Sequence, residues 1–214
     1  MVFVQLAISI ALDARSVLEA EQLSLHQRRV FGPVVSDSTM HRMLAAFDED
    51  MFAALSRARA RARRVVWTLL TLRPNGFPWM SVAGKRLDKW VIVDVDATII
   101  TSASKKDGAG ATFKKTKATG LHNLPSKSWT INRSWMAAAN TAADLDAWLR
   151  LLTLHDQDDL AEAEPQTMRL RIYHQPARLA RHARRRYLRL DPSWPWTDAF
   201  VLAWNRLTAL PQTT

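Results

Sequence analysis

The sequence predicts an α/β protein that is mostly helical. Apolar residues recur at helical spacing through most of the first 72 residues, and again from Leu121 to the C-terminus. Between these regions, the β-branched run at residues 91–100 is typical of a strand. The chain has 214 residues, of which 48% are hydrophobic and nine are tryptophan, so it is long enough to bury a core.

The N-terminal region, residues 1–78, is predicted to be helical. Residues 1–12 predict a helix of the protein rather than a secretory leader, because no basic segment precedes the apolar run. A second helix over residues 16–30 should end at Gly32-Pro33, and residues 36–39 supply N-cap chemistry for a third. This pair resembles a helix-turn-helix, although ordinary bundles contain such pairs too. In a helix-turn-helix the groove or a phosphate would be faced by Ser38, Thr39, His41 and Arg42.

Residues 51–72 predict a long helix that is rich in arginine. At helical spacing one stripe of it contains Arg57, Arg61 and Arg64. Guanidinium groups match the geometry of phosphates, so the stripe is a candidate DNA contact. The alternative is an ordinary solvated helix face.

The C-terminal region, residues 117–214, is predicted to be helical and basic. The pattern predicts an amphipathic helix over residues 135–154, a short strand over 168–173 and a basic helix over 176–188. Between Pro165 and Leu190 there is no acid. The same stretch contains eight arginines, which are Arg169, Arg171, Arg178, Arg181, Arg184, Arg185, Arg186 and Arg189. Such density predicts a surface that follows a phosphate backbone.

Composition narrows the classes of partner. Thirty Lys and Arg against twenty Asp and Glu give a net charge of +10, which favours nucleic acid first and an acidic membrane second. The absence of cysteine excludes disulfides, thiolate zinc sites and cysteine nucleophiles, and it fits a cytoplasmic, nucleoid-associated protein. No apolar run reaches the length of a membrane span. We therefore expect no membrane partner and no small-molecule cofactor.

The strand over residues 91–100 carries the candidate chemistry. Asp94 and Asp96 point to the same face of this otherwise apolar strand. Buried carboxylates on one face repel each other, and a divalent metal would compensate; a solvated strand edge is the alternative. Other acids, namely Asp144, Asp146 and residues 156–159, are expected to be solvated faces or helix-end charges.

One interpretation of this strand is a phosphatase. Asp94, Asp96 and Thr98 match the D-x-D-x-T motif of haloacid-dehalogenase-like phosphatases, in which the first Asp attacks phosphorus in a magnesium-dependent reaction. That chemistry also needs a later Lys and a second acidic loop at the ends of parallel strands. The sequence shows no such sheet.

The other interpretation is a resemblance to bacterial insertion-sequence transposases of the group called transposase DDE domain, group 1. It is carried by Val30-Phe31-Gly32-Pro33, Gly84-Lys85-Arg86-Leu87, the acidic strand, Phe113-Lys114-Lys115-Thr116, Thr119-Gly120-Leu121-His122 and residues 176–185. The resemblance implies that residues 79–116 are the first strands of a ribonuclease-H-like core. It also implies three carboxylates that hold Mg²⁺ ions for DNA cleavage and joining, the first being Asp96 with Asp94 beside it.

The resemblance also shows what is missing. In the family, the second Asp and the Glu fall between the Phe-Lys-Lys-Thr and Thr-Gly-Leu segments, whereas here Thr116 is followed almost at once by Thr119. No acid occurs between Asp107 and Asp144, and Met1 looks internal to the family's N-terminal region. We therefore expect a catalytically incomplete remnant, in which a truncated β element is flanked by the two helical regions. A DNA-binding regulator of transposase ancestry is the remaining alternative.

The remnant should bind DNA, such as insertion-sequence ends, and a homo-oligomer would hide its exposed strand edges. The residues expected to contact DNA are Arg57, Arg61, Arg64, Arg178, Arg181, Arg184, Arg185 and Arg186.

Overall fold

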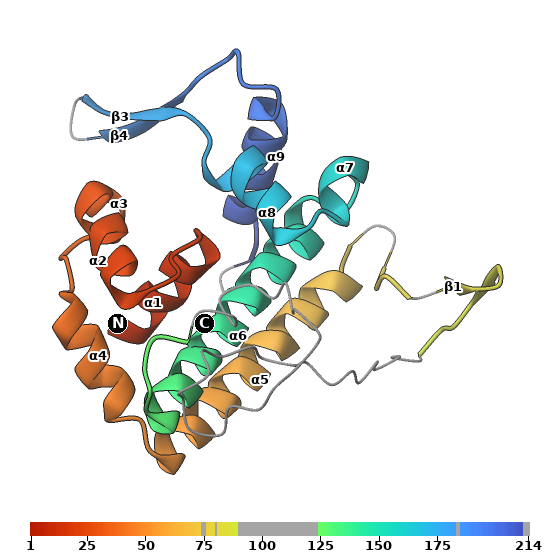
Figure 1. The fold of residues 1–214 in the computed structure, drawn as a ribbon. Helices are drawn as coiled ribbons and strands as arrows, with labels where there is room; N and C mark the ends of the chain where they lie inside the picture. Colours follow the sequence, from red (N-terminus) through yellow and green to blue (C-terminus); the bar gives the residue numbers. More distant parts are fainter. Residues whose placement is uncertain (74–75, 80, 90–123, 183–184, 212–214) are drawn as a thin grey trace, which may run out of the picture.

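The computed structural model describes residues 1–73, 76–79, 81–89, 124–182 and 185–211, and this part of the chain is mostly helical (Figure 1). The N-terminal elements are α1 (Val2–Ala11), α2 (Val17–His26), α3 (Arg28–Phe31), α4 (Asp37–Ala45), α5 (Glu49–Thr71), β1 (Ser81–Val82) and β2 (Lys85–Arg86). The C-terminal elements are α6 (Trp129–Thr153), α7 (Asp158–Ala161), α8 (Pro165–Met168), the π-helical turn η1 (Arg169–Tyr173), β3 (Ala177–His182), β4 (Arg185–Leu190) and α9 (Thr197–Thr208).

The first hydrophobic core lies among α1, α2, α4 and the first half of α6. Trp135 of α6 is completely buried there, together with Leu6 and Ile10 of α1 and Met40 of α4. Small residues at the centre of α6, such as Ala138, let α1 pack closely against it. The helices predicted over residues 1–12, after residue 36 and over 51–72 are confirmed, whereas the one predicted over 16–30 is divided at Gln27 into α2 and α3. The Ser36 hydroxyl caps α4 by accepting from the backbone N–H of Thr39.

Helices α5 and α6 run side by side in the same direction (Figure 1). The Arg133 guanidinium near the start of α6 pairs with Glu49 at the start of α5. Further along, the Arg59 Nε lies 2.7 Å from the Asp144 carboxylate, and beyond the end of α5 the Arg73 Nη1 donates to the Leu151 carbonyl at 3.2 Å. These contacts fix one face of α5 against α6 and leave the opposite face open.

A second core is built where α6 ends. It consists of Leu154, Leu160, Met168, Ile172 and Ala203 from α6's C-cap, α7, α8, η1 and α9. The short strand predicted over residues 168–173 is wrong, because α8 and η1 occupy this range. The burial of residues 169 and 172, three positions apart, is typical of a helical turn and not of a strand with period two.

The basic helix predicted over residues 176–188 is also wrong. β3 and β4 form an antiparallel hairpin in which Ala177 lies opposite Leu190, and Leu179 opposite Leu188. These four apolar residues alternate with arginine along each strand, so they gather on one face of the hairpin. A helix would have distributed the same residues around its circumference.

The segment over residues 79–116, predicted to hold the first strands of a ribonuclease-H-like core, is described only at its start. β1 and β2 form a small antiparallel hairpin whose turn, Ala83-Gly84, has positive φ angles of 49° and 75°. The acidic strand and most of the predicted ribonuclease-H-like segment lie in residues 90–123, outside the described residues. That core therefore stays a prediction. Among the described helices, none is long and apolar enough to cross a membrane.

Candidate nucleic-acid interface

The arginine stripe of α5 lies on the face turned away from α6. Val66 and Leu70 bury the inner face, whereas Arg57, Arg61 and Arg64 are exposed. Arg59, between them in sequence, is held by Asp144 instead. Within the part of the chain that the structure describes, the three stripe arginines make no ion pair. Their guanidinium groups are therefore available to phosphates.

The β3–β4 hairpin presents a second basic surface. Residues two apart share a face, so Arg178 lies on the same face as Arg185, Tyr187 and Arg189, opposite the apolar face. Arg178, Arg185 and Arg189 are exposed, and Arg181 is exposed on the other face, opposite Arg186 in the register. The predicted DNA contacts included Arg178, Arg181, Arg185 and Arg186. Arg189 was counted among the eight arginines of the predicted phosphate surface but was left out of those contacts. The alternation of apolar residues over 177–190 could have placed it on the same face as Arg178.

The apolar face of the hairpin borders a half-open groove of about 840 Å³. Leu179 and Leu188 line it on the hairpin side, and Leu25 of α2 with Arg28 and Arg29 lines the other side. Figure 1 shows the hairpin extending from the helical body above α3. The apolar residues thus face the protein, and the arginines of the other face point away from it.

Two of the eight C-terminal arginines serve the fold. Arg169 is only 7% exposed, and its guanidinium donates to the carbonyls of Ile10 and Ala11 at 3.2 and 2.9 Å and to the Asp13 carboxylate at 2.8 Å. Arg171 pairs with Asp159 at 2.8 Å and stacks over a tryptophan ring. A continuous phosphate-binding surface over all eight arginines is therefore wrong. Of the C-terminal arginines that the structure describes, those of the hairpin are the ones open to a phosphate.

Two acids on α6 are engaged by arginines of the protein. Asp144 pairs with Arg59, and Asp146 is buried, where it pairs with Arg150 at 2.8 Å and accepts a hydrogen bond from Tyr173. Burial, with Asp146 adjacent, raises the pKa of Tyr173 far above its ordinary value, so this phenol stays protonated. The expectation that Asp146 lies on a solvated face is wrong.

Asp156, just after the end of α6, is also paired with an arginine. Two hydrogen bonds from the Arg206 guanidinium hold the pKa of Asp156 well below its usual range. Among the described residues, no group of three His, Asp or Glu side chains could hold a metal ion. The described carboxylates therefore do not fit the magnesium ions of a strand-transfer site.

The remaining predicted site residues lie elsewhere or serve local structure. Asp94, Asp96 and Arg184 are outside the described residues. In the helix-turn-helix-like pair, Arg42 folds back to donate to the Ser38 carbonyl and the Thr39 hydroxyl at the start of α4. DNA contact by this pair stays a prediction.

Comparison with known proteins identifies one family. The profile described as transposase DDE domain group 1 matches residues 109–212. Within the described residues this match includes α6 to α9 and the β3–β4 hairpin, and it begins after Asp94 and Asp96. Neither a curated protein nor a solved structure matches the chain.

Proposed function

The chain belongs to the insertion-sequence DDE transposases through residues 109–212, and from that premise we propose that it is a transposase remnant which binds DNA without cutting it. The proposal has two parts. The first is DNA binding through arginines on the surface. The second is the loss of strand-transfer chemistry.

The arginines without an internal partner are the observation that carries DNA binding. Eight arginines of the described chain, including Arg59, Arg169 and Arg206, take part in ion pairs with acids of the protein. The stripe on α5 and the outer face of the hairpin have exposed arginines that do not. With a net charge of +10, these surfaces attract a polyanion, and guanidinium groups bind phosphates well.

The sequence between Asp107 and Asp144 supports the loss of strand-transfer chemistry. A DDE site needs three carboxylates to hold two divalent ions. The chain has no acid between Asp107 and Asp144, where the resemblance places the second and third ligands. Of the acids that follow in the described region, Asp144, Asp146, Asp156 and Asp159 are paired with arginine, and no group of three described His, Asp or Glu side chains could hold a metal ion. Asp94 and Asp96 alone cannot hold two ions.

DNA binding is tested by the affinity of the purified chain for a random duplex at several salt concentrations. We expect log Kd to rise steeply with log salt, and the triple variant Arg57→Gln, Arg61→Gln, Arg64→Gln to reduce the slope by up to about 3. Arg59→Gln is the control in the same helix, because its guanidinium is bound to Asp144, and it should leave the slope nearly unchanged. An identical slope for the triple variant and the unaltered chain would contradict the role of the stripe.

Catalysis is tested by incubating the chain with DNA and Mg²⁺ or Mn²⁺. We expect neither cleavage nor joining, and metal-dependent cleavage that disappears in Asp96→Asn would overturn the remnant proposal. Turnover of a phosphomonoester that disappears in Asp94→Asn would instead support the phosphatase alternative. A preference of several orders of magnitude for one DNA site over random DNA would support the regulator.

A further inference from the structure

We infer that the β3–β4 hairpin engages double-stranded DNA in addition to the arginine stripe of α5, and that the bound DNA stabilises the hairpin itself. This inference rests on the proposed DNA binding and names the form of DNA that the hairpin binds. It is carried by the register of the two strands, which the sequence did not reveal.

The register places arginines opposite one another. Arg178 lies opposite Arg189, and Arg181 lies opposite Arg186. Like charges at directly opposed positions destabilise a strand pair. Neither strand has an acid that would offset the repulsion, and the first acid after β4, Asp191, accepts hydrogen bonds from Ser193. The hairpin therefore has an electrostatic cost that a bound polyanion would remove.

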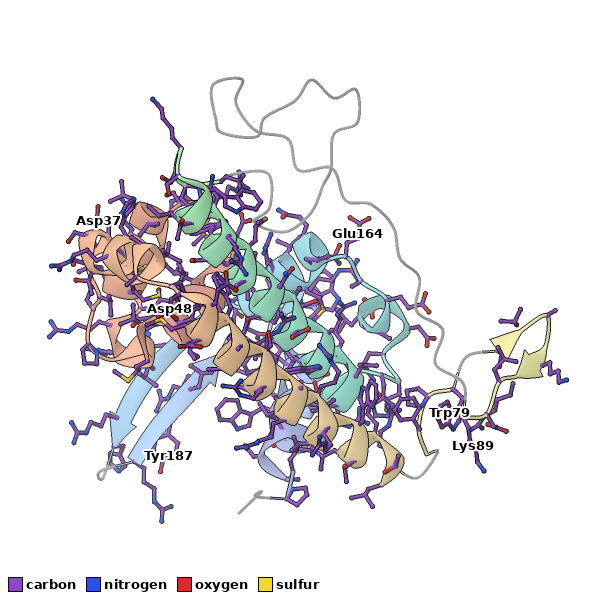
Figure 2. The ribbon with its side chains drawn as sticks, turned by 90° about the horizontal axis from the view of Figure 1, so that it is seen from below. Asp37, Asp48, Trp79, Lys89, Glu164 and Tyr187 are labelled. Atoms are coloured by element: carbon purple, nitrogen blue, oxygen red, sulfur yellow. The ribbon has the colours of Figure 1, made fainter. Side chains whose placement is uncertain are left out.

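The hairpin also has little support from the rest of the protein. Among the described elements, β3 and β4 make extensive contacts only with each other. Figure 1 shows the hairpin extending away from the helices, and Figure 2 shows Tyr187 at the edge of the molecule. A two-stranded hairpin is only marginally stable by itself in water. Repulsion within such a hairpin has a large effect on how often it opens.

The shape and chemistry of the hairpin fit duplex DNA. The major groove is wide enough to admit a two-stranded ribbon. Arg178, Arg185 and Arg189 share one face of the ribbon, with the exposed Tyr187 among them. Guanidinium groups on that face can bind phosphates along the groove edge or the acceptor edge of guanine within it.

One substitution distinguishes a hairpin that binds DNA from a basic hairpin that is only solvated. Arg178→Glu creates an opposite-charge pair with Arg189, so it should stabilise the hairpin in the free protein while it weakens DNA binding. Lys127→Glu makes the same change in net charge at an exposed site before α6, and it is the matched control. Arg189→Glu creates the reverse pair and should behave like Arg178→Glu.

The experiment combines hydrogen exchange of the hairpin amides with affinity for a duplex of about two helical turns. Duplex DNA should slow exchange in the hairpin of the unaltered chain. Without DNA, Arg178→Glu should exchange more slowly there than the unaltered chain. Its duplex affinity should fall about tenfold, the loss of one charge-assisted contact, with a salt slope lower by at least about 1. Lys127→Glu should change neither hairpin exchange nor the slope.

The possible failures are distinguishable. If both Arg178→Glu and Arg189→Glu bind the duplex as tightly as Lys127→Glu does, the hairpin inference is overturned while DNA binding stands. If the unaltered chain binds no DNA at all, both the inference and the proposed function are overturned. Equal protection of the hairpin by a single strand of the same length, or protection by acidic lipid vesicles in place of DNA, would overturn its assignment to duplex DNA.

Discussion

The arginines of this chain differ in function because they differ in their partners. Arg169 is buried and binds two backbone carbonyls and a carboxylate, whereas Arg61 is exposed on α5 and Arg178 on the hairpin. The buried guanidinium donates to the Ala11 carbonyl at the C-terminal end of α1 and adds a donor to the Ile10 carbonyl, which also accepts from the Asp13 N–H. Charge density along the sequence does not distinguish these cases, because the partners of Arg169 are more than 150 residues away.

Arg169→Ala should destabilise the protein strongly. The substitution removes the donor of the Ala11 carbonyl and one donor of the Ile10 carbonyl. It also removes one of the two arginine partners of Asp13, the other being Arg15, and we expect the free energy of unfolding to fall by about 3 kcal/mol. Urea denaturation measures it. Arg61→Ala removes an exposed arginine from a helix and should stay within about 0.5 kcal/mol of the unaltered chain. Equal unfolding midpoints for the two variants would contradict the structural role of Arg169.

At the scale of elements, local patterns predicted the helices and failed at the C-terminal hairpin. Helices were predicted correctly from the apolar run of residues 1–12, from the N-cap residue Ser36 and from the periodicity of the long arginine-rich segment. Capping and periodicity act within one element, so the local sequence is enough to predict them. Over residues 176–188 the many arginines suggested a helical surface. The alternation of apolar residues with arginine, at Leu179 in one strand and Leu188 in the other, was the better guide to the structure. It reflects a hairpin with one apolar face, and that face borders α2 and α3.

Asp48 should contribute to stability through its position at the start of α5. Its carboxylate accepts a hydrogen bond of 2.8 Å from the Met51 N–H (Figure 2 labels Asp48), so Asp48→Ala should cost about 1 kcal/mol of unfolding free energy. Asp50→Ala removes the same charge from the first turn without removing the N-cap. Thermal or urea unfolding of both variants separates the cap from the helix dipole. A loss as large in Asp50→Ala would show that charge alone matters.

At the scale of the whole molecule, the two cores share one long helix. Trp135 of α6 is buried in the first core, and Leu154 at its C-cap is buried in the second. Arg169 connects the cores again, from η1 to the end of α1. The sequence predicted the helices that build the cores, but the pairing of α1 with α6 depends on contacts between residues more than 100 positions apart. The exposed arginine stripe on α5 was predictable because it needs only one helix.

The shared helix leads us to expect that the described helical body unfolds as one cooperative unit. Leu160→Ala removes a completely buried side chain from the second core and should cost about 2–5 kcal/mol. Because α6 and Arg169 couple the cores, amide exchange should become faster in α1 as well as in α9. For amides that exchange only by global unfolding, the rate should rise by the same factor in both helices. Leu18→Ala, at a leucine that is 52% exposed on α2, is the control and should change neither helix appreciably. Faster exchange in α9 with unchanged protection of α1 would show instead that the two cores unfold separately, and that neither α6 nor the Arg169 contacts transmit the loss.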